Sequence, residues 1–319
     1  MFARPVTRFG LCLLLLALAG CVTSYPVPES QRVAFSSGDA LELSDTPFFP
    51  QARYQCGPAA LATVLVDSGI AVTPEDLVDR VYIPALEGSL QAEMVAAARQ
   101  ADRLPVRIPA SLDGVMNSLQ AGRPVLVLLN QALPWYPAWH YAVVIGYSAQ
   151  RQALLLRSGT TARQWMDLSV FHQQWQQAGG WGLVTLEPGA SPNGLVLDAY
   201  MDASAAAEAA GMQTLAERAY RAGTEHWPEA SAPHLGLANS LYAQGDSPAA
   251  ARVLSRLLSQ HPEHAVALNN LAQIRAEAGA DCEALSLANR AMDLAPDGLR
   301  SEIRRTRDAI RQQAEPDCG

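Results

Sequence analysis

The stretch Gln51-Ala-Arg-Tyr-Gln-Cys-Gly-Pro-Ala-Ala-Leu-Ala-Thr-Val-Leu65 decides how the first half of the chain folds. It follows a rigid lead-in, Pro47-Phe-Phe-Pro50, in which each proline disfavours helix for the residue before it. From Ala59 to Asp67 nearly every residue is apolar, which predicts a buried helix. Proline is tolerated in a first turn, so Cys56-Gly57-Pro58 is expected to begin this helix. The unpaired N–H groups and the helix dipole there are expected to lower the pKa of the Cys56 thiol.

A second reactive residue lies far along the chain. His140 stands near the start of the apolar run Ala138-Trp-His-Tyr-Ala-Val-Val-Ile-Gly-Tyr147, which predicts a strand. A cysteine at a helix start and a distant histidine on a strand form the arrangement of papain-like hydrolases. The alternative for Cys56 is a buried core cysteine, and the turn at Gly57 and Pro58 argues against it. The other histidines lie in helical or repeat contexts and are expected at the surface: His172, His226, His234, His261 and His264.

Gln51, the run Cys56-Gly-Pro-Ala-Ala-Leu61 and the strand at His140 together resemble the double-glycine leader peptidases. Those are papain-like cysteine peptidases that form the front domain of bacteriocin exporters. The resemblance covers residues 45–186. The arrangement of the whole chain resembles a standalone lipoprotein form of these peptidases with C-terminal repeats. It implies an α+β papain-like cysteine peptidase domain, with a helical half packed on an antiparallel sheet and the active site at their seam.

The resemblance also implies a role for each site residue. Cys56 would be the nucleophile and His140 the general base and acid. The side chain of Gln51 would stabilise the oxyanion together with the Cys56 backbone N–H, and Gln55 is a second candidate for that role.

The third position of the triad departs from the family pattern. The family places an Asp or Asn on the strand that follows the histidine, and here that strand reads Leu154-Leu-Leu-Arg-Ser-Gly159. Arg157 cannot accept a hydrogen bond, so Ser158 is the candidate. The alternative that Asp167 or Asn130, from elsewhere in the chain, orients His140 stays open.

The first 20 residues read as a signal segment, with Arg4 and Arg8 before the apolar run Leu11–Leu18. The sequence Leu18-Ala-Gly-Cys21 resembles a bacterial lipobox, which implies that Cys21 is lipidated and becomes the N-terminus. The alternative is a plain signal peptide with a coincidental cysteine. Because Val22 is not an Asp, the outer membrane, facing the periplasm, is favoured. Residues 21–44 would form a tether with an edge strand near Gln31–Phe35.

Composition limits the partners and the compartment. The chain has 319 residues and a net charge of −8, which predicts two domains and argues against nucleic acid. No cluster of His, Cys and Asp has metal-ligand spacing, so neither a metal nor another cofactor is predicted. An oxidising compartment favours a disulfide between Cys282 and Cys318 over two free thiols.

Helices and strands are expected in order around this site. Thr73 caps a helix that Pro74 begins, and Ser89–Ala101 and Ser111–Ala121 are further helices. Strands are expected at Pro105–Pro109, Val125–Asn130, Tyr141–Tyr147, Ala153–Arg157 and Trp181–Leu186. In the stiff loop 131–138 and just after it, Trp135, Tyr136 and Trp139 either line the cleft or cover the sheet edge.

An internal repeat of 34 residues begins after Gly194. Its markers are Gly211, Gly245 and Gly279, then Ala216, Ala250 and Ala284, and then Pro228, Pro262 and Pro296. This period matches the tetratricopeptide repeat, in which two helices flank a glycine turn. Residues 187–196 are then a flexible linker and residues 197–319 an all-α repeat domain, capped by a helix at Leu299–Ala314.

The sequence therefore predicts a lipid-anchored, periplasm-facing cysteine peptidase that hydrolyses peptide bonds through a Cys–His thioester. The repeats would hold a peptide or protein partner on their concave face near Cys56, and membrane contact is expected through the lipid only. By analogy alone, the resemblance implies a Gly-Gly-like cleavage site. Two alternatives stay open: a weak or inactive binding adaptor, and amidase or transglutaminase-type acyl transfer by the same pair.

Overall fold

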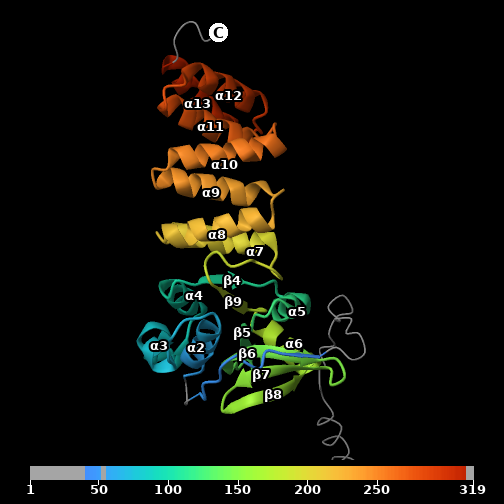
Figure 1. Cartoon of the computed structure of the whole chain (residues 1–319). Coiled ribbons are helices and arrows are strands. Elements are labelled where there is room, and N and C mark those ends of the chain that lie inside the picture. Colours follow the sequence, from blue (N-terminus) through green and yellow to red (C-terminus); the bar gives the residue numbers. More distant parts are fainter. Residues whose placement is uncertain (1–39, 52–54, 314–319) are drawn as a thin grey trace, which may run out of the picture.

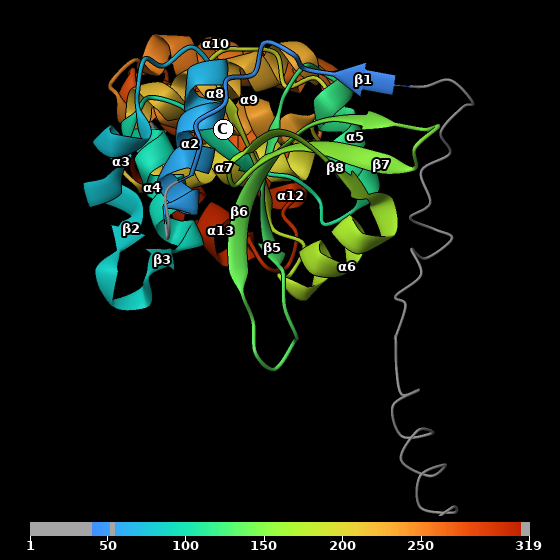
Figure 2. The same cartoon turned by 90° about the horizontal axis from the view of Figure 1, so that it is seen from below.

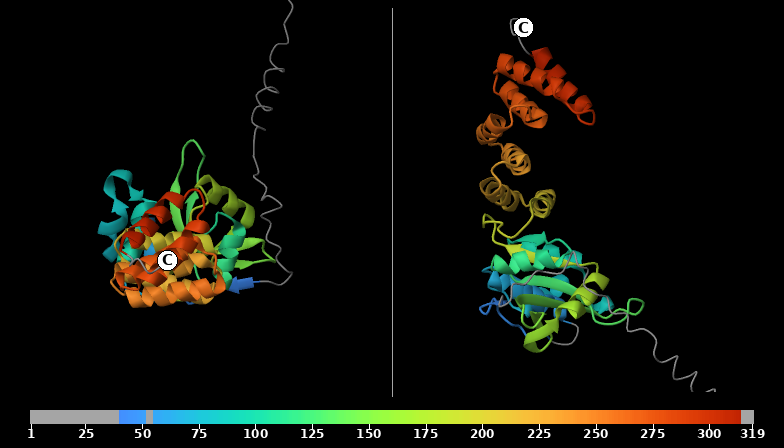
Figure 3. Two further views of the ribbon diagram at one scale, coloured as in Figure 1. Left: turned by 90° about the horizontal axis from the view of Figure 1, so that it is seen from above. Right: turned by 90° about the vertical axis from the view of Figure 1, so that its right-hand side faces the viewer.

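A computed structural model describes residues 40–51 and 55–313. The signal segment, the lipidation candidate Cys21, the edge strand expected near Gln31–Phe35 and Cys318 lie outside the described residues. The chain forms a sheet covered by helices, and a column of helices extends from it (Figure 1). A view from the side shows this column leading away from the sheet towards the C-terminal end (Figure 3).

The sheet has seven antiparallel strands in the order β4-β9-β5-β6-β7-β8, and β1 pairs with the far end of β6. The strands are β1 Ala40–Glu42, β4 Leu104–Arg107, β5 Val125–Asn130, β6 Trp139–Ser148, β7 Ala153–Ser158, β8 Thr161–Asp167 and β9 Gly182–Leu186. The central strand β6 pairs with β5, β7 and β1, so its residues are held on both sides.

Helices cover both faces of this sheet, as Figures 1 and 2 show. One face carries α2 Cys56–Asp67, α3 Pro74–Val81 and α4 Gln91–Gln100, and the other carries α5 Leu112–Gln120 and α6 Leu168–Gln177. In β5, Val125, Val127 and Leu129 join the core under α5 and α6, and Leu126 and Leu128 join the core under α2 and α4. A strand buried on both faces needs a continuous apolar run, which explains its sequence.

The helix starts follow from local capping. Thr73 and Asp76 form a capping box at α3, with Pro74 at its first position. Ser111 caps α5 through the Gly114 N–H. The strongly amphipathic or capped segments are therefore the ones that the sequence predicts best.

Three features were not expected from the sequence. The first is the pair β8–α6 between residues 161 and 177, and the second is the short hairpin formed by β2 Tyr82–Ile83 and β3 Gly88–Ser89. The third is β1. Ser89 lies in β3 rather than in the helix expected at Ser89–Ala101, which begins at Gln91.

The repeats form three helix pairs and a final helix. They are α7 Leu197–Ala209 and α8 Gln213–His226, α9 Ser231–Ala243 and α10 Ser247–Gln260, α11 Ala265–Glu277 and α12 Asp281–Asp293, then α13 Arg300–Gln313. The marker glycines at 211, 245 and 279 all have positive φ between the helices of a pair. The marker alanines at 216, 250 and 284 are fully buried.

The segment between the sheet and the repeats is packed in place, unlike the flexible linker expected. The Arg123 guanidinium donates to the carbonyl oxygens of Ser191 and Asn193. Gly194 has φ of +75°, and a Cβ there would lie 2.4 Å from the Asn117 carbonyl oxygen. Leu195 then enters the same hydrophobic cluster as strand and repeat residues, so one core continues from the sheet into the repeats.

Among the described residues, no helix is both long and apolar enough to cross a membrane.

Candidate active site

Cys56 is the first residue of α2, and its side chain is half-buried. The helix lies against β6, and the sulfur packs on the apolar cluster beneath α2 and α4. Backbone groups of Tyr141, Gly57 and Cys56 itself form hydrogen bonds with the sulfur. The thiol therefore lies at the helix start, facing the strand that carries His140.

Burial has a larger effect on the pKa of the Cys56 thiol than the N-terminus of α2 has. Desolvation raises the pKa of Cys56 above its ordinary value, and the three backbone hydrogen bonds lower it by less. The expectation of a lowered pKa was wrong, because it weighed the helix end without the apolar packing. In the resting protein the sulfur is held as the thiol.

His140 meets the serine that the sequence places in the third position. Its Nε2 lies 3.0 Å from the Ser158 hydroxyl oxygen, and Ser158 itself is only 4% exposed. Burial lowers the pKa of His140, so the imidazole is held neutral. When Nε2–H donates to Ser158, Nδ1 keeps its lone pair and can accept a proton.

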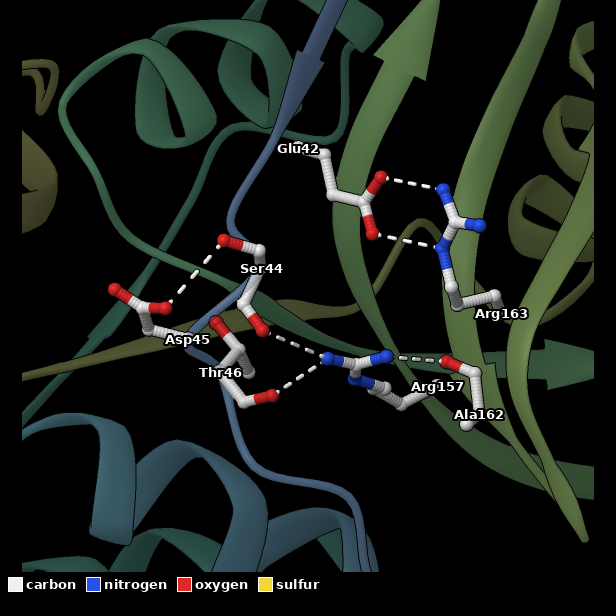
Figure 4. Close-up of polar contacts among 7 residues, drawn as sticks. All are labelled: Glu42, Ser44, Asp45, Thr46, Arg157, Ala162 and Arg163. Atoms are coloured by element: carbon white, nitrogen blue, oxygen red, sulfur yellow. Dashed lines mark hydrogen bonds and ion pairs between the residues drawn. The ribbon is translucent and has the colours of Figure 1, made fainter.

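Arg157, the neighbouring candidate, points to the other side of β7, because successive side chains of a strand alternate. Its guanidinium donates to the carbonyl oxygens of Ser44, Thr46 and Ala162, as Figure 4 shows. The arginine thus ties the lead-in segment before α2 to the sheet.

That lead-in carries Gln51 to the site. The Gln51 backbone N–H donates to the Gly159 carbonyl oxygen at 3.0 Å, and its side-chain amide donates to the Tyr141 carbonyl oxygen at 3.3 Å. The backbone of Tyr141 therefore contacts both Gln51 and the sulfur of Cys56. The structure brings the glutamine, the cysteine and the histidine strand together around this one residue.

The other two candidates for orienting the histidine serve elsewhere. Asp167 caps α6 through the Ser169 N–H and hydroxyl. The Asn130 side-chain oxygen accepts from the N–H groups of Ala132 and Ala138 and so holds the base of the loop between β5 and β6. Of the four residues considered, Ser158 is the one hydrogen-bonded to His140.

Sequence reasoning missed the residues that pack around the first turn of α2. A Cβ on Gly57 would lie 2.2 Å from the Ser89 hydroxyl oxygen, so only glycine lets β3 approach the helix. The Ser89 carbonyl accepts from the Tyr141 hydroxyl at 3.2 Å. The Ser89 hydroxyl is buried without a hydrogen-bond partner among the described residues. The signal available was Gly57 directly after the cysteine.

Two further predictions from the sequence concern the exposure of the histidines and the pairing of Cys282. His172 and His234 are buried, not exposed, because α6 and α9 turn those faces inward. Cys282 is disulfide-bonded, and Cys318 lies outside the described residues. Its pairing with Cys318 stays a prediction.

Comparison with known families agrees with this architecture. Residues 43–182 match the Peptidase_C39 like family, and residues 235–298 match the tetratricopeptide repeat. The chain therefore carries an α+β C39-like peptidase domain with an antiparallel sheet, followed by an all-helical tetratricopeptide region. The curated proteins contain no match to this sequence.

Several solved structures are similar to parts of the chain. One is a C39-like peptidase from Bacillus anthracis, with a TM-score of 0.40 and 18% identity over 46% of this chain and 98% of that one. Another is the peptidase domain of Streptococcus ComA, a bifunctional ABC transporter, with a TM-score of 0.37 and 20% identity over 44% and 98%. The type III secretion chaperone SycD of Yersinia enterocolitica, in complex with a peptide of YopD, gives a TM-score of 0.35 and 18% identity over 37% and 95%.

Proposed function

We propose that this protein is a cysteine peptidase in which Cys56 is the nucleophile and His140 the general base and acid. The observation that carries the proposal is the contact of 3.0 Å between His140 Nε2 and the Ser158 hydroxyl oxygen. Tyr141, which follows His140 in β6, contacts the Cys56 sulfur through its backbone. In the tautomer whose Nε2–H donates to the Ser158 hydroxyl, Nδ1 is free to take a proton.

Both groups are neutral at rest, so proton transfer accompanies the attack. His140 Nδ1 takes the thiol proton as the sulfur forms a bond to the carbonyl carbon, and it then gives that proton to the leaving amine. A water molecule, deprotonated by His140, attacks the thioester, the C–S bond breaks, and His140 returns the proton to the sulfur to restore the thiol. The Gln51 amide and the Cys56 N–H stabilise the oxyanion once a substrate carbonyl takes the place of Tyr141 as acceptor.

The repeats would hold a peptide or protein partner. Support comes from a cavity of about 180 Å³ between α9 and α11, lined in part by Asn239, Tyr242, Asn270 and Gln273. Amide side chains can pair with the backbone of an extended peptide. Because the repeats continue the core of the peptidase domain, a partner bound to them would be held at a fixed position relative to Cys56.

The N-terminal sequence supports a location at the outer membrane, facing the periplasm, with lipid on Cys21. Mass spectrometry of the mature N-terminus tests it. A diacylated Cys21 peptide is the expected result, and an unmodified mature N-terminus would exclude the lipid anchor.

The peptidase activity is tested with a peptide library that includes Gly-Gly sequences. The wild-type chain should generate new N-termini, and the Cys56→Ala and His140→Ala variants should not. Products are identified by mass spectrometry, which also separates hydrolysis from amide release or transfer to an amine. Cleavage that survives Cys56→Ala would exclude the proposed nucleophile.

A binding adaptor is the second candidate, and one observation favours it. The third position holds an uncharged serine, and burial disfavours the charged form of both Cys56 and His140. An adaptor would keep its partner after Cys56→Ala and lose it after substitution of Asn239 and Asn270. Capture of the same partner by wild type and Cys56→Ala, without cleavage of any peptide, would decide for the adaptor.

A further inference from the structure

A hairpin next to the candidate site exposes an unusual amount of aromatic surface. Residues 131–138 join β5 to β6 and, with Trp139 at the start of β6, form a hairpin that protrudes from the rest of the sheet (Figure 2). In this aromatic hairpin Leu133 is 51% exposed, Trp135 79%, Tyr136 78% and Trp139 54%. More than half of the surface of each of these side chains is exposed to solvent. They are four of the ten large apolar side chains exposed in the described part of the chain.

The composition of the aromatic hairpin suits one kind of surface. It reads Gln131-Ala-Leu-Pro-Trp-Tyr-Pro-Ala-Trp139 and contains no charged residue, although the whole chain carries a net charge of −8. Tryptophan and tyrosine combine an apolar ring with one polar group, and they are enriched where hydrocarbon meets water in membranes.

The base of the hairpin is closed by hydrogen bonds of its own. The Asn130 side-chain oxygen accepts from the Ala132 N–H at 3.1 Å and from the Ala138 N–H at 3.0 Å. The Gln131 N–H donates to the Ala138 carbonyl oxygen at 2.9 Å. Asn130 is 1% exposed, so this clasp is anchored in the core.

The tip is closed in the same way. The Tyr136 N–H donates to the Leu133 carbonyl oxygen at 3.0 Å, and these two residues form an isolated bridge. Pro134 and Pro137 have no N–H group to satisfy. An unsatisfied backbone group is costly in an apolar medium, so this hydrogen bond and the two prolines lower the cost of placing the tip in one.

The shape of the hairpin favours a bilayer over a peptide as its occupant. Peptide side chains bind in concave pockets, and a projecting tip offers none. Five cavities in the described residues are lined by the segment after β9 and by repeat helices, and the aromatic hairpin lines none of these five. A bilayer surface needs only an apolar wedge that protrudes.

We propose that the aromatic hairpin inserts Leu133, Trp135 and Tyr136 into the interfacial layer of a lipid bilayer. This contact is independent of the lipid expected on Cys21. His140 directly follows Trp139, so insertion would hold the candidate active site close to the membrane surface. That consequence rests on the proposed function, and it points to polypeptides at the bilayer surface as the substrate class.

The test uses residues 22–319, which retain every described element and lack the acylation site. The protein is floated with phosphatidylcholine vesicles, with and without acyl chains brominated to quench tryptophan. Wild type should float and be quenched. Trp135→Ser with Tyr136→Ser should reduce the partition coefficient by about tenfold or more. The matched control is Leu294→Ser with Leu299→Ser, two exposed leucines at the far end of the repeats, which should float like wild type.

Three outcomes would overturn the proposal. Equal flotation of the hairpin variant and wild type would mean that the hairpin does not bind lipid. Binding that needs anionic lipid and disappears with salt would mean that charge, not the aromatic tip, is responsible. A hairpin variant that floats normally but no longer cleaves a soluble peptide would assign the hairpin to peptide docking. Failure of Cys56→Ala to change flotation would leave the lipid contact standing even if the peptidase proposal failed.

Discussion

Burial sets the resting protonation of both reactive side chains. Desolvation lowers the pKa of His140 from an ordinary value of 6.5 and raises that of Cys56 from 9.0. Below pH 6.5 the unfolded chain binds a proton at His140 that the folded protein resists. Above pH 9.0 the unfolded chain loses a proton at Cys56 that the folded protein keeps. These two groups therefore favour folding most between these values and reduce stability outside them.

The first prediction concerns the reactivity of Cys56. Alkylation by iodoacetamide should be slow at neutral pH and should accelerate only above pH 9.0, the ordinary value for the thiol. His140→Ala should leave the neutral rate unchanged, because no imidazolium supports a thiolate at rest. Alkylation is followed at the Cys56 peptide by mass spectrometry, with Cys56→Ser as the blank. Rapid labelling at neutral pH that His140→Ala abolishes would show a resting ion pair and contradict this account.

The second prediction concerns Ser158. Ser158→Ala removes the hydrogen bond that orients His140 and should reduce kcat/KM about fivefold, the rate equivalent of about 1 kcal/mol. Ser158→Asp places a carboxylate at Nε2 and should raise the pKa of His140, moving the acid limb of the pH–rate profile upward. If Ser158 only stabilised the fold, substituting it would not shift the acid limb of the pH–rate profile. Identical profiles for Ser158→Ala, Ser158→Asp and wild type would remove Ser158 from the site.

At the scale of elements, the sequence revealed the parts that carry a local signal. The capping box at Thr73 and the apolar run of β5 each follow from a few neighbouring residues. The strand β8 has a mixed sequence, Thr161-Ala-Arg-Gln-Trp-Met-Asp167, and three of its seven residues are exposed. It forms because β7, the strand just before it, offers an edge to pair with, and the mixed composition of β8 does not signal that pairing. Likewise, the sequence predicted that Cys56 starts a helix and that His140 and Ser158 lie on successive strands, but not the packing that raises the thiol pKa.

The third prediction tests how β3 and α2 fit together. Gly57→Ala would put a Cβ 2.2 Å from the Ser89 hydroxyl oxygen and 2.6 Å from its Cβ. Overpacking of this kind should cost about 1–3 kcal/mol of unfolding free energy. Ser89→Gly removes both clashing atoms, so adding Gly57→Ala to Ser89→Gly should cost much less. Urea denaturation of the two single variants and the double variant completes the cycle. An equal cost of Gly57→Ala in both backgrounds would contradict the packing described.

At the scale of the whole molecule, the 34-residue period predicted the repeats well because each marker has a physical role. Glycine is needed where φ is positive, and alanine where helices touch. The junction with the sheet could not be predicted in this way. The residues 187–196 are rich in proline, glycine and serine and look like a linker, and contacts with Arg123 and Asn117 and the burial of Leu195 hold them in place. The two parts of the chain consequently share one apolar core.

A shared core predicts that the two parts unfold together. Five of the six tryptophans precede residue 187, so tryptophan fluorescence reports mainly on the sheet, and far-UV circular dichroism reports mainly on the repeat helices. The two denaturation curves of the wild type should coincide. Tyr200, which is 1% exposed in α7, lies at the junction and packs against Trp227.

Tyr200→Ala should therefore cost about 3–5 kcal/mol and separate the two curves, since the cavity weakens the core where the parts meet. Tyr200→Phe is the matched control: it keeps the ring and loses only the hydrogen bond to the Ala219 carbonyl oxygen, worth about 1 kcal/mol, so its curves should still coincide. Separate curves in the wild type would mean that the shared core does not couple the parts. A partner bound to the repeats would then hold no fixed position relative to Cys56, and recruitment would act only through proximity in the chain.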